Sequence, residues 1–151
     1  MKRALTVGAL LVITLSGCAV VSDALGPGET TVFDVTAGDC LNDASESGDV
    51  STVPVVDCDE PHDSEVYAVI TMDDGEYPGD AAVVTQANDS CRDSFERFIG
   101  VPAAQSRYMF NALYPTEDSW NGGDREILCR VALVPDGTVE KVTGSLAGAA
   151  S

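Results

Sequence analysis

Histidine and basic residues are scarce in this chain, and each of these two shortages argues against a class of function. The sequence has one histidine, one tryptophan, and 8 lysines and arginines against 25 aspartates and glutamates. Its formal net charge of −17 argues against nucleic-acid binding, because phosphates require cationic contacts. A catalytic zinc normally has three protein ligands rich in histidine, which one histidine cannot supply. We therefore expect no nucleic-acid partner, no metal centre and no cofactor.

The sequence also lacks the patterns of common catalytic and calcium sites. It contains no Gly-x-Ser-x-Gly motif. Asp57, Asp59, Asp63 and Glu65 are spaced in a way that resembles a calcium-binding loop. However, Pro61 and His62 occupy the places where an EF-hand needs an oxygen ligand and a glycine. The many carboxylates do not indicate which two would face a substrate. We therefore predict that the protein is not an enzyme.

The N-terminal apolar run is too short for a membrane-spanning helix. Ala4 to Leu15 is 12 residues long, whereas a spanning helix needs roughly 20. Two basic residues precede this run and small residues follow it, as in a secretory signal. The segment Leu15-Ser16-Gly17-Cys18 resembles the bacterial lipobox, in which the signal is cut before a cysteine that carries a diacylglyceryl group. The alternative is an ordinary secreted protein with a chance cysteine near its cleavage site.

This pattern predicts four segments and a location. Residues 1–17 form a lipoprotein signal peptide, 18–30 a lipidated tether, 31–146 the folded domain and 147–151 a loose tail. Cleavage removes two basic residues, so the formal charge falls from −17 to −19. Such a chain is not attracted to an anionic bilayer. We therefore expect acyl chains on Cys18 to hold it in the lipid bilayer, on the extracytoplasmic face of the cell membrane.

Once Cys18 is assigned to lipid, an even number of cysteines remains. An even number in an exported chain predicts two disulfides, and four cysteines allow three pairings. We favour Cys40 with Cys58 and Cys91 with Cys129, because each bond then closes a loop within one half of the domain. A metal site is the alternative, but it needs closely spaced cysteine pairs that are absent.

Hydrophobic periodicity predicts an α+β fold: an antiparallel sheet of about five strands with one long helix packed on it. Alternation or continuous apolar character predicts strands at 31–35, 53–58, 65–72, 107–113 and 126–134, the second and third paired with each other. A helix is expected from Asp80, as N-cap, to a stop at Gly100. Its buried face would comprise Val84, Ala87, Cys91, Phe95 and Phe98. Residues 114–123 are expected to be a loop, and 143–151 a loose end.

Several motifs in order resemble the septum formation domain of actinobacterial envelope proteins. They lie between Gly38 and Leu146, nearly the whole mature domain. The most specific are Cys58-x-x-Pro61-His62 and Ser119-Trp120-x-x-Gly123-Asp124-Arg125, with the four cysteines around them.

The resemblance implies a role tied by name to septum formation, with no established catalytic activity. It also implies attachment through a membrane helix or a lipid anchor. One departure is Ala147, where the family often has a basic residue, and this puts a role for a charged tail in doubt.

His62 and Glu65 form the first pair of candidate partner-binding residues. Pro61 fixes the turn before the histidine, and carboxylates at 60, 63 and 65 surround it in sequence. Such a histidine can act as an acid, a base or a metal ligand. The structural alternative is a histidine that donates to a nearby carboxylate or carbonyl within its turn.

The other candidate partner-binding residues are Trp120, Asp124 and Arg125. An aromatic ring in a glycine-rich loop, beside an arginine, can stack on a sugar or on a partner's side chain. The structural alternative is that Arg125 pairs with a nearby acid and Trp120 covers one end of the core.

These observations predict an envelope lipoprotein that acts as a non-catalytic interaction module, with a protein or cell-wall partner. The alternative is a cell-wall hydrolase or cation-dependent enzyme centred on His62 and Glu65.

Overall fold

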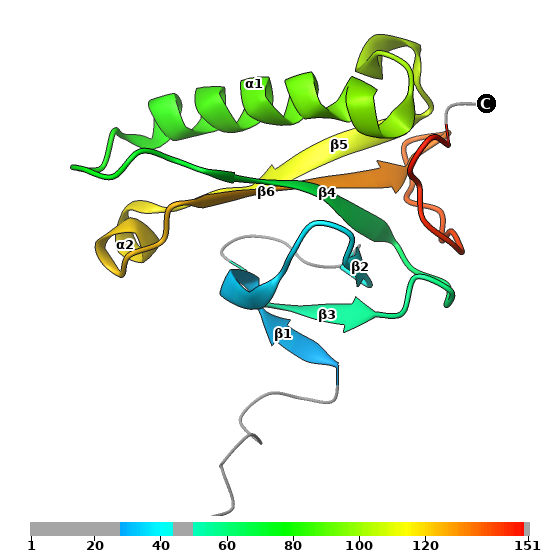
Figure 1. Cartoon of the computed structure of the whole chain (residues 1–151), viewed down its shortest axis with the longest axis horizontal. Helices are drawn as coiled ribbons and strands as arrows, with labels where there is room; N and C mark the ends of the chain where they lie inside the picture. Colours follow the sequence, from blue (N-terminus) through cyan, green and yellow to red (C-terminus); the bar gives the residue numbers. More distant parts are fainter. Residues whose placement is uncertain (1–27, 44–49, 150–151) are drawn as a thin grey trace, which may run out of the picture.

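The computed structural model describes residues 28–43 and 50–149, which fold into three layers. Cys18, the signal peptide and most of the tether lie outside the described residues. Helix α1 covers one face of the central strands β4, β6 and β5, and strands β1, β2 and β3 lie on the other side (Figure 1). The strands are β1 (Glu29–Thr31), β2 (Cys40–Leu41), β3 (Thr52–Val56), β4 (Ser64–Thr71), β5 (Tyr108–Leu113) and β6 (Glu126–Leu133). The helices are α1 (Asp80–Ile99), α2 (Glu117–Asn121) and the 3-10 turns η1 (Val32–Asp34) and η2 (Ala103–Gln105).

All strand pairs are antiparallel, in the order β1-β3-β2-β4-β6-β5. This confirms the predicted α+β class, with six strands in place of about five. The predicted pairing of residues 53–58 with 65–72 is wrong, because β2 lies between β3 and β4 and pairs with both. The Cys40–Cys58 disulfide holds β2 against the end of β3. A two-residue strand is too short for periodicity to reveal.

The predicted strand at 31–35 is also wrong. Strand β1 ends at Thr31, and its first two residues were expected to belong to the tether. The next three residues form the turn η1, in which the Thr31 hydroxyl donates to the Asp34 carboxylate at 2.7 Å. The turn breaks the alternation, so Val35 is buried while Phe33 is 59% exposed.

The long helix lies where the sequence predicts it, and the predicted Ala87, Cys91 and Phe95 are buried; the prediction is wrong at the two ends of the buried face. Gly79 rather than Asp80 stands at the N-cap, and Gly100 ends the helix with a positive φ of 101°. The buried side chains lie four residues apart on one stripe: Val83, Ala87, Cys91, Phe95 and Ile99. The predicted Val84 and Phe98 are only half-buried, beside this stripe. Within the described residues, no helix is both long and apolar enough to cross a bilayer.

Both predicted disulfides are present. Cys40 bonds to Cys58 and Cys91 to Cys129, each pair with its Cα atoms 5.3 Å apart. The second bond joins α1 to β6 inside the larger hydrophobic cluster, which fills the space between helix and sheet. A smaller cluster, which includes Val66 and Leu128, lies on the opposite face of the sheet beneath β2 and β3.

The closing segment from residue 143 to 149 is not a loose end. Leu146 is buried at 4% exposure, and the Gly148 N–H donates to the Phe98 carbonyl at 2.7 Å. Ala149 packs against the larger cluster. The small residues that suggested a free tail instead allow the backbone to lie close to the domain. Residues 150 and 151 lie outside the described residues.

Candidate functional site

His62 is fully buried, and its hydrogen bonds are to backbone groups. Its Nδ1 lies 2.9 Å from the Glu60 carbonyl, so that nitrogen is the donor. Its own N–H and C=O exchange hydrogen bonds with Val142, which forms an isolated antiparallel bridge. Nε2 has no hydrogen-bond partner among the described residues. The side chain therefore donates to a carbonyl within its own turn, and the backbone of His62 holds the C-terminal segment, which was expected to be a loose end.

Glu65 is buried in the same region, and both of its carboxylate oxygens are occupied. The Ser145 hydroxyl donates to one oxygen at 2.8 Å, and the Leu146 N–H donates to the other at 2.6 Å. An acid or base must reach a substrate, and neither side chain of this pair faces solvent. The geometry therefore does not favour the hydrolase centred on His62 and Glu65.

Trp120 and Arg125 pack against each other at the opposite end of the sheet. The Arg125 guanidinium carbon lies 3.9 Å from the centre of the Trp120 ring, and the indole N–H donates to the Gly75 carbonyl at 3.0 Å. Arg125 also pairs with Asp74 at 3.0 Å. This hydrogen-bonded ion pair, with help from the Gly75 N–H, lowers the pKa of Asp74. Together these contacts tie α2 to the loop that follows β4.

Tyr77 completes this aromatic cluster. Its ring lies 5.8 Å from the Trp120 ring in an edge contact. Its hydroxyl donates to Asp80 at 2.7 Å, and this bond raises the pKa of Tyr77 to about 12. Because Trp120 is buried, it covers one end of the core and is not free to stack on a sugar.

Asp124 connects α2 to the start of β6. One oxygen accepts from the Ser119 hydroxyl at 3.0 Å and the other from the Glu126 N–H at 3.0 Å. Ser119 also forms a capping box with Thr116, which explains why a short helix interrupts the loop expected at 114–123. The five predicted residues therefore lie in two separate places, at opposite ends of the sheet.

A groove on the helix-free face of the sheet is the best candidate for a binding site. We call it the sheet groove; it has a volume of about 640 Å³ and lies between η1 and strands β5 and β6. Its lining residues are Val32, Phe33, Val50, Ser51, Asn111, Ala112, Leu113, Tyr114, Thr116, Ser119, Asp124, Glu126, Leu128 and Arg130. Of the five predicted residues, only Asp124 lines it. Asp124 and Arg125 also line a smaller adjoining hollow of about 290 Å³.

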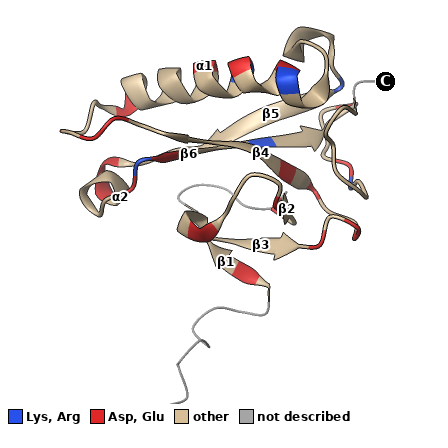
Figure 2. Ribbon diagram, viewed as in Figure 1, with Lys and Arg blue, Asp and Glu red and all other residues tan. Residues whose placement is uncertain are grey.

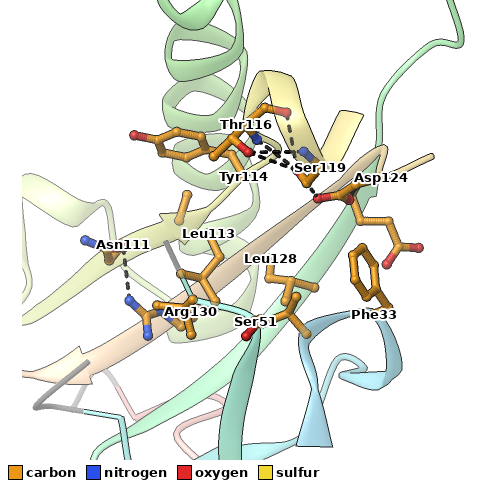
Figure 3. Close-up of a pocket in the computed structure, with 14 residues that line it drawn as sticks. Phe33, Ser51, Asn111, Leu113, Tyr114, Thr116, Ser119, Asp124, Leu128 and Arg130 are labelled. Atoms are coloured by element: carbon orange, nitrogen blue, oxygen red, sulfur yellow. Dashed lines mark hydrogen bonds between the residues drawn. The ribbon is translucent and has the colours of Figure 1, made fainter. Parts of the chain in front are cut away.

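Apolar side chains form the floor and sides of the sheet groove. In Figure 3, Leu113 and Leu128 lie between the rings of Tyr114 and Phe33. Phe33 is 59% exposed and Tyr114 43% exposed, so both rings are available to a partner. Exposed aromatic and apolar groups around a concave surface are typical of binding sites.

The polar groups of the sheet groove are of two kinds. Arg130 is already engaged, by an ion pair with Asp43 and a hydrogen bond to Asn111 (Figure 3). The Glu126 carboxylate is half-buried and has no hydrogen-bond or ion-pair partner among the described residues. A basic group entering the groove would therefore find an available carboxylate.

The charge of the whole chain is strongly acidic. Asp124 and Glu126 line the sheet groove, and further acidic residues lie on α2, along several connecting loops and on α1 across the sheet, whereas basic residues are few (Figure 2). In the described part of the chain, no three His, Cys, Asp or Glu side chains are grouped in a way that fits a metal ion. The arrangement favours binding of a cationic or apolar group.

Sequence reasoning missed Phe33, Leu113 and Tyr114. The alternating pattern at 31–35 placed Phe33 on a strand, and its exposure depends on the turn η1. Leu113 ends a strand that was predicted and Tyr114 begins the loop that was expected after it, but which face of the strand lies opposite α1 is decided by packing. An aromatic directly after an apolar strand was the available signal.

Comparison with known proteins places the chain among envelope proteins. A family model described as "Septum formation" matches residues 37–151. The relatives include "Putative lipoprotein LppN" of Mycobacterium tuberculosis (strain ATCC 25618 / H37Rv) and its counterpart in Mycobacterium bovis (strain ATCC BAA-935 / AF2122/97), each 31% identical over 119 residues. These alignments cover 76% of this chain and 63% of each relative. No solved structure matches the chain. With a family match over more than half of its residues, the chain belongs to the septum formation family.

Proposed function

We propose that this protein is a membrane-anchored, extracytoplasmic lipoprotein that acts at the septum by binding and catalyses no reaction. The family description and the name of the mycobacterial relatives fit an envelope-associated lipoprotein. Anchoring through Cys18 and the binding role are the parts that we add.

The allocation of the cysteines is the observation that carries the proposal. Four of the five cysteines in the sequence form two disulfides with each other, and Cys18 is the fifth. Disulfides form and persist in oxidising compartments outside the cytoplasm. Cys18 follows an apolar run and is the last residue of a lipobox-like motif, and this position supports acylation of its thiol.

The sheet groove supports binding rather than catalysis. Its Asp124 and Arg130 are held by internal hydrogen bonds and an ion pair, and the only carboxylate in it without such a partner among the described residues is Glu126. General acid–base hydrolysis of a glycoside needs two available carboxylates facing each other. The exposed rings of Phe33 and Tyr114 instead offer contact area to a partner.

Replacing the lipid-bearing residue tests the anchor. We expect Cys18→Ser to move the protein from the detergent phase to the aqueous phase in a cloud-point partition of solubilised cells. The physical reason is that two acyl chains give stable membrane binding and their loss leaves an acidic, water-soluble domain. Mass spectrometry of the intact wild-type protein should show a diacylglyceryl-modified Cys18.

Ser16→Ala is the matched control for this experiment, because it changes a neighbouring residue and keeps the thiol. It should partition like the wild type. Equal partition of Cys18→Ser and wild type into the detergent phase would rule out Cys18 as the anchor.

Changing an exposed ring in the sheet groove tests the binding role. We expect Phe33→Ser to lose a specific partner in a crosslinking pull-down from intact membranes, and to reproduce the septation defect of a gene deletion. The ring is mostly exposed, so the substitution should leave the free energy of unfolding within about 0.5 kcal/mol of wild type.

Val139→Ser is the matched control, because Val139 is 36% exposed and does not line the sheet groove. It should retain every partner. If wild type, Phe33→Ser and Val139→Ser capture the same partners, the groove is not the binding surface.

A further inference from the structure

Strand β5 is a free edge of the sheet and borders the sheet groove. It is the last strand in the order β1-β3-β2-β4-β6-β5, so among the described residues only one of its sides is paired. Asn111 and Leu113 of this strand line the groove, and Met109 at its start is 58% exposed. The free edge and the groove therefore form one continuous surface.

The register shows which backbone groups face outward. The Val134 N–H donates to the Arg107 carbonyl at 3.2 Å, so Arg107 and every second residue after it bond to β6. The backbone N–H and C=O groups of the residues between them, Tyr108, Phe110 and Ala112, point away from β6. The Tyr108 N–H accordingly meets the Ser106 hydroxyl at 3.0 Å. The N–H and C=O groups of Phe110 and Ala112 face outward, and none has a partner among the described residues.

This edge lacks the usual protection against strand pairing. Proteins protect edges with lysine, proline, a bulge or a very short strand. Strand β5 reads Tyr-Met-Phe-Asn-Ala-Leu, six residues with no charge and no proline, in unbroken register with β6. The opposite edge strand, β1, is only three residues long and carries Glu29. An unprotected edge beside a groove is the surface that an extended peptide uses when it adds a strand.

The surrounding charge indicates what kind of segment fits. The carboxylates of Glu117 and Asp118 lie in the first turn of α2, directly after β5, and Glu126 lines the groove. Arg107 stands at the other end of the strand. The formal charge of −17 disfavours a second copy of this chain, because two such chains repel each other.

We infer that the free edge of β5 binds an extended basic segment of a second protein. This segment adds a strand to the sheet through Phe110 and Ala112 and directs basic side chains toward Glu126 and α2. The inference rests on the proposed binding role of the sheet groove, and it is independent of the lipid anchor.

A probe peptide tests this inference. The full chain, purified from solubilised membranes, is titrated with a peptide of alternating lysine and valine and monitored by calorimetry. We expect saturable binding that weakens as salt is added, because exposed charges are screened. A peptide in which glutamate replaces lysine should not bind. A peptide whose backbone amides are N-methylated along both of its edges cannot donate hydrogen bonds to β5, and should bind roughly tenfold more weakly or not at all.

Two variants locate the site. Ala112→Pro removes an outward N–H without touching the ladder to β6, and should weaken binding roughly tenfold. Met109→Lys places a positive charge on an exposed side chain of the edge, and should also weaken binding of the basic peptide. Met109→Lys keeps the test valid if Ala112→Pro fails to fold. Val139→Ser again serves as the control and should bind like the wild type.

Each remaining outcome contradicts the inference in a distinct way. Equal binding of the methylated and unmethylated peptides would show that no strand is added, and equal binding of the glutamate peptide would show that charge does not select the partner. A dimer in sedimentation that Ala112→Pro abolishes would assign the edge to a second copy. If partners are lost with Phe33→Ser but kept with Ala112→Pro and Met109→Lys, the groove is the binding site and the edge is excluded. The partition of the protein into detergent should be the same as for the wild type in every case.

Discussion

Replacing Cys91 and Cys129 together by alanine is expected to lower the free energy of unfolding by about 4 kcal/mol. The bond closes a segment with a sequence separation of 38 and restricts the unfolded chain accordingly. Both cysteines are fully buried between α1 and β6, so the variant also loses packing at the centre of the larger cluster. A loss of this size is a large share of the 5–15 kcal/mol typical of a domain, so the domain should be partly unfolded at 37 °C.

Urea unfolding followed by circular dichroism measures this effect. The matched control is the double alanine variant of Cys40 and Cys58, whose sequence separation of 18 predicts a smaller loss of about 3 kcal/mol. Reduction of the wild type should bring its stability below that of either variant. A loss of less than about 1 kcal/mol in the Cys91 and Cys129 variant would show that the helix is held to the sheet by packing alone.

Asp43→Ala is expected to lower the free energy of unfolding by about 3 kcal/mol, because it leaves a mostly buried arginine without its counter-ion. The Asp43 side chain is 3% exposed and that of Arg130 is 14% exposed. Asp43 also accepts from the Ser64 hydroxyl at 2.7 Å, so it joins the segment after β2 to both β4 and β6. Within the described part of the chain, removing it leaves the Arg130 guanidinium with a hydrogen bond to Asn111 alone.

A double-mutant cycle separates the ion pair from the fold. The variant Asp43→Ala with Arg130→Met removes both charges and should recover at least half of the lost stability, because replacing a buried pair by apolar groups is often neutral. The matched single variant is Asp89→Ala, whose pair with Arg92 is exposed and should be worth less than about 1 kcal/mol. Equal losses for Asp43→Ala and Asp89→Ala would contradict a structural role of the buried pair.

The stretch around His62 illustrates how an unusual sequence can serve the fold. A proline, a histidine and several acids in one turn have the residue types of a catalytic site. In the structure, His62 bridges to Val142 and Glu65 holds Ser145 and Leu146. These contacts join positions about 80 residues apart. Neighbours at this separation give no local signal, so the role of the stretch was open until the chain was folded.

The same argument explains the candidate site. Asp124 was predicted from a motif and does line the sheet groove, but its oxygens are taken up by α2 and β6. Arg125 pairs with an acid and Trp120 is buried, whereas the contact of the Arg125 guanidinium with the Trp120 ring was not predicted. The exposed rings that do line the groove, Phe33 and Tyr114, lie 81 positions apart in sequence and border the same groove only because η1 folds over the face of the sheet opposite α1.

The sequence alone determined the features that depend on local pattern and chemistry. Apolar runs predicted the strands β3, β4, β5 and β6, and the three-and-four spacing of apolar residues predicted the helix α1, whereas the alternation at 31–35 predicted a strand that is not there. The even cysteine count predicted two disulfides, and the short loops within each half favoured the pairing that is present. The N-terminal motif predicted export and acylation, which stay predictions because those residues lie outside the described part of the chain.

Only the tertiary structure decided how the strands pair, where the C-terminal segment packs and which edge of the sheet is unpaired. Strand β2 has two residues, too few for any periodicity, yet it separates β3 from β4. The C-terminal segment looks unstructured in isolation, because its binding energy comes from His62 and Glu65 far away in sequence. The free edge of β5 follows from its place at the end of the strand order. Each of these features depends on contacts between distant residues, which a local sequence pattern does not specify.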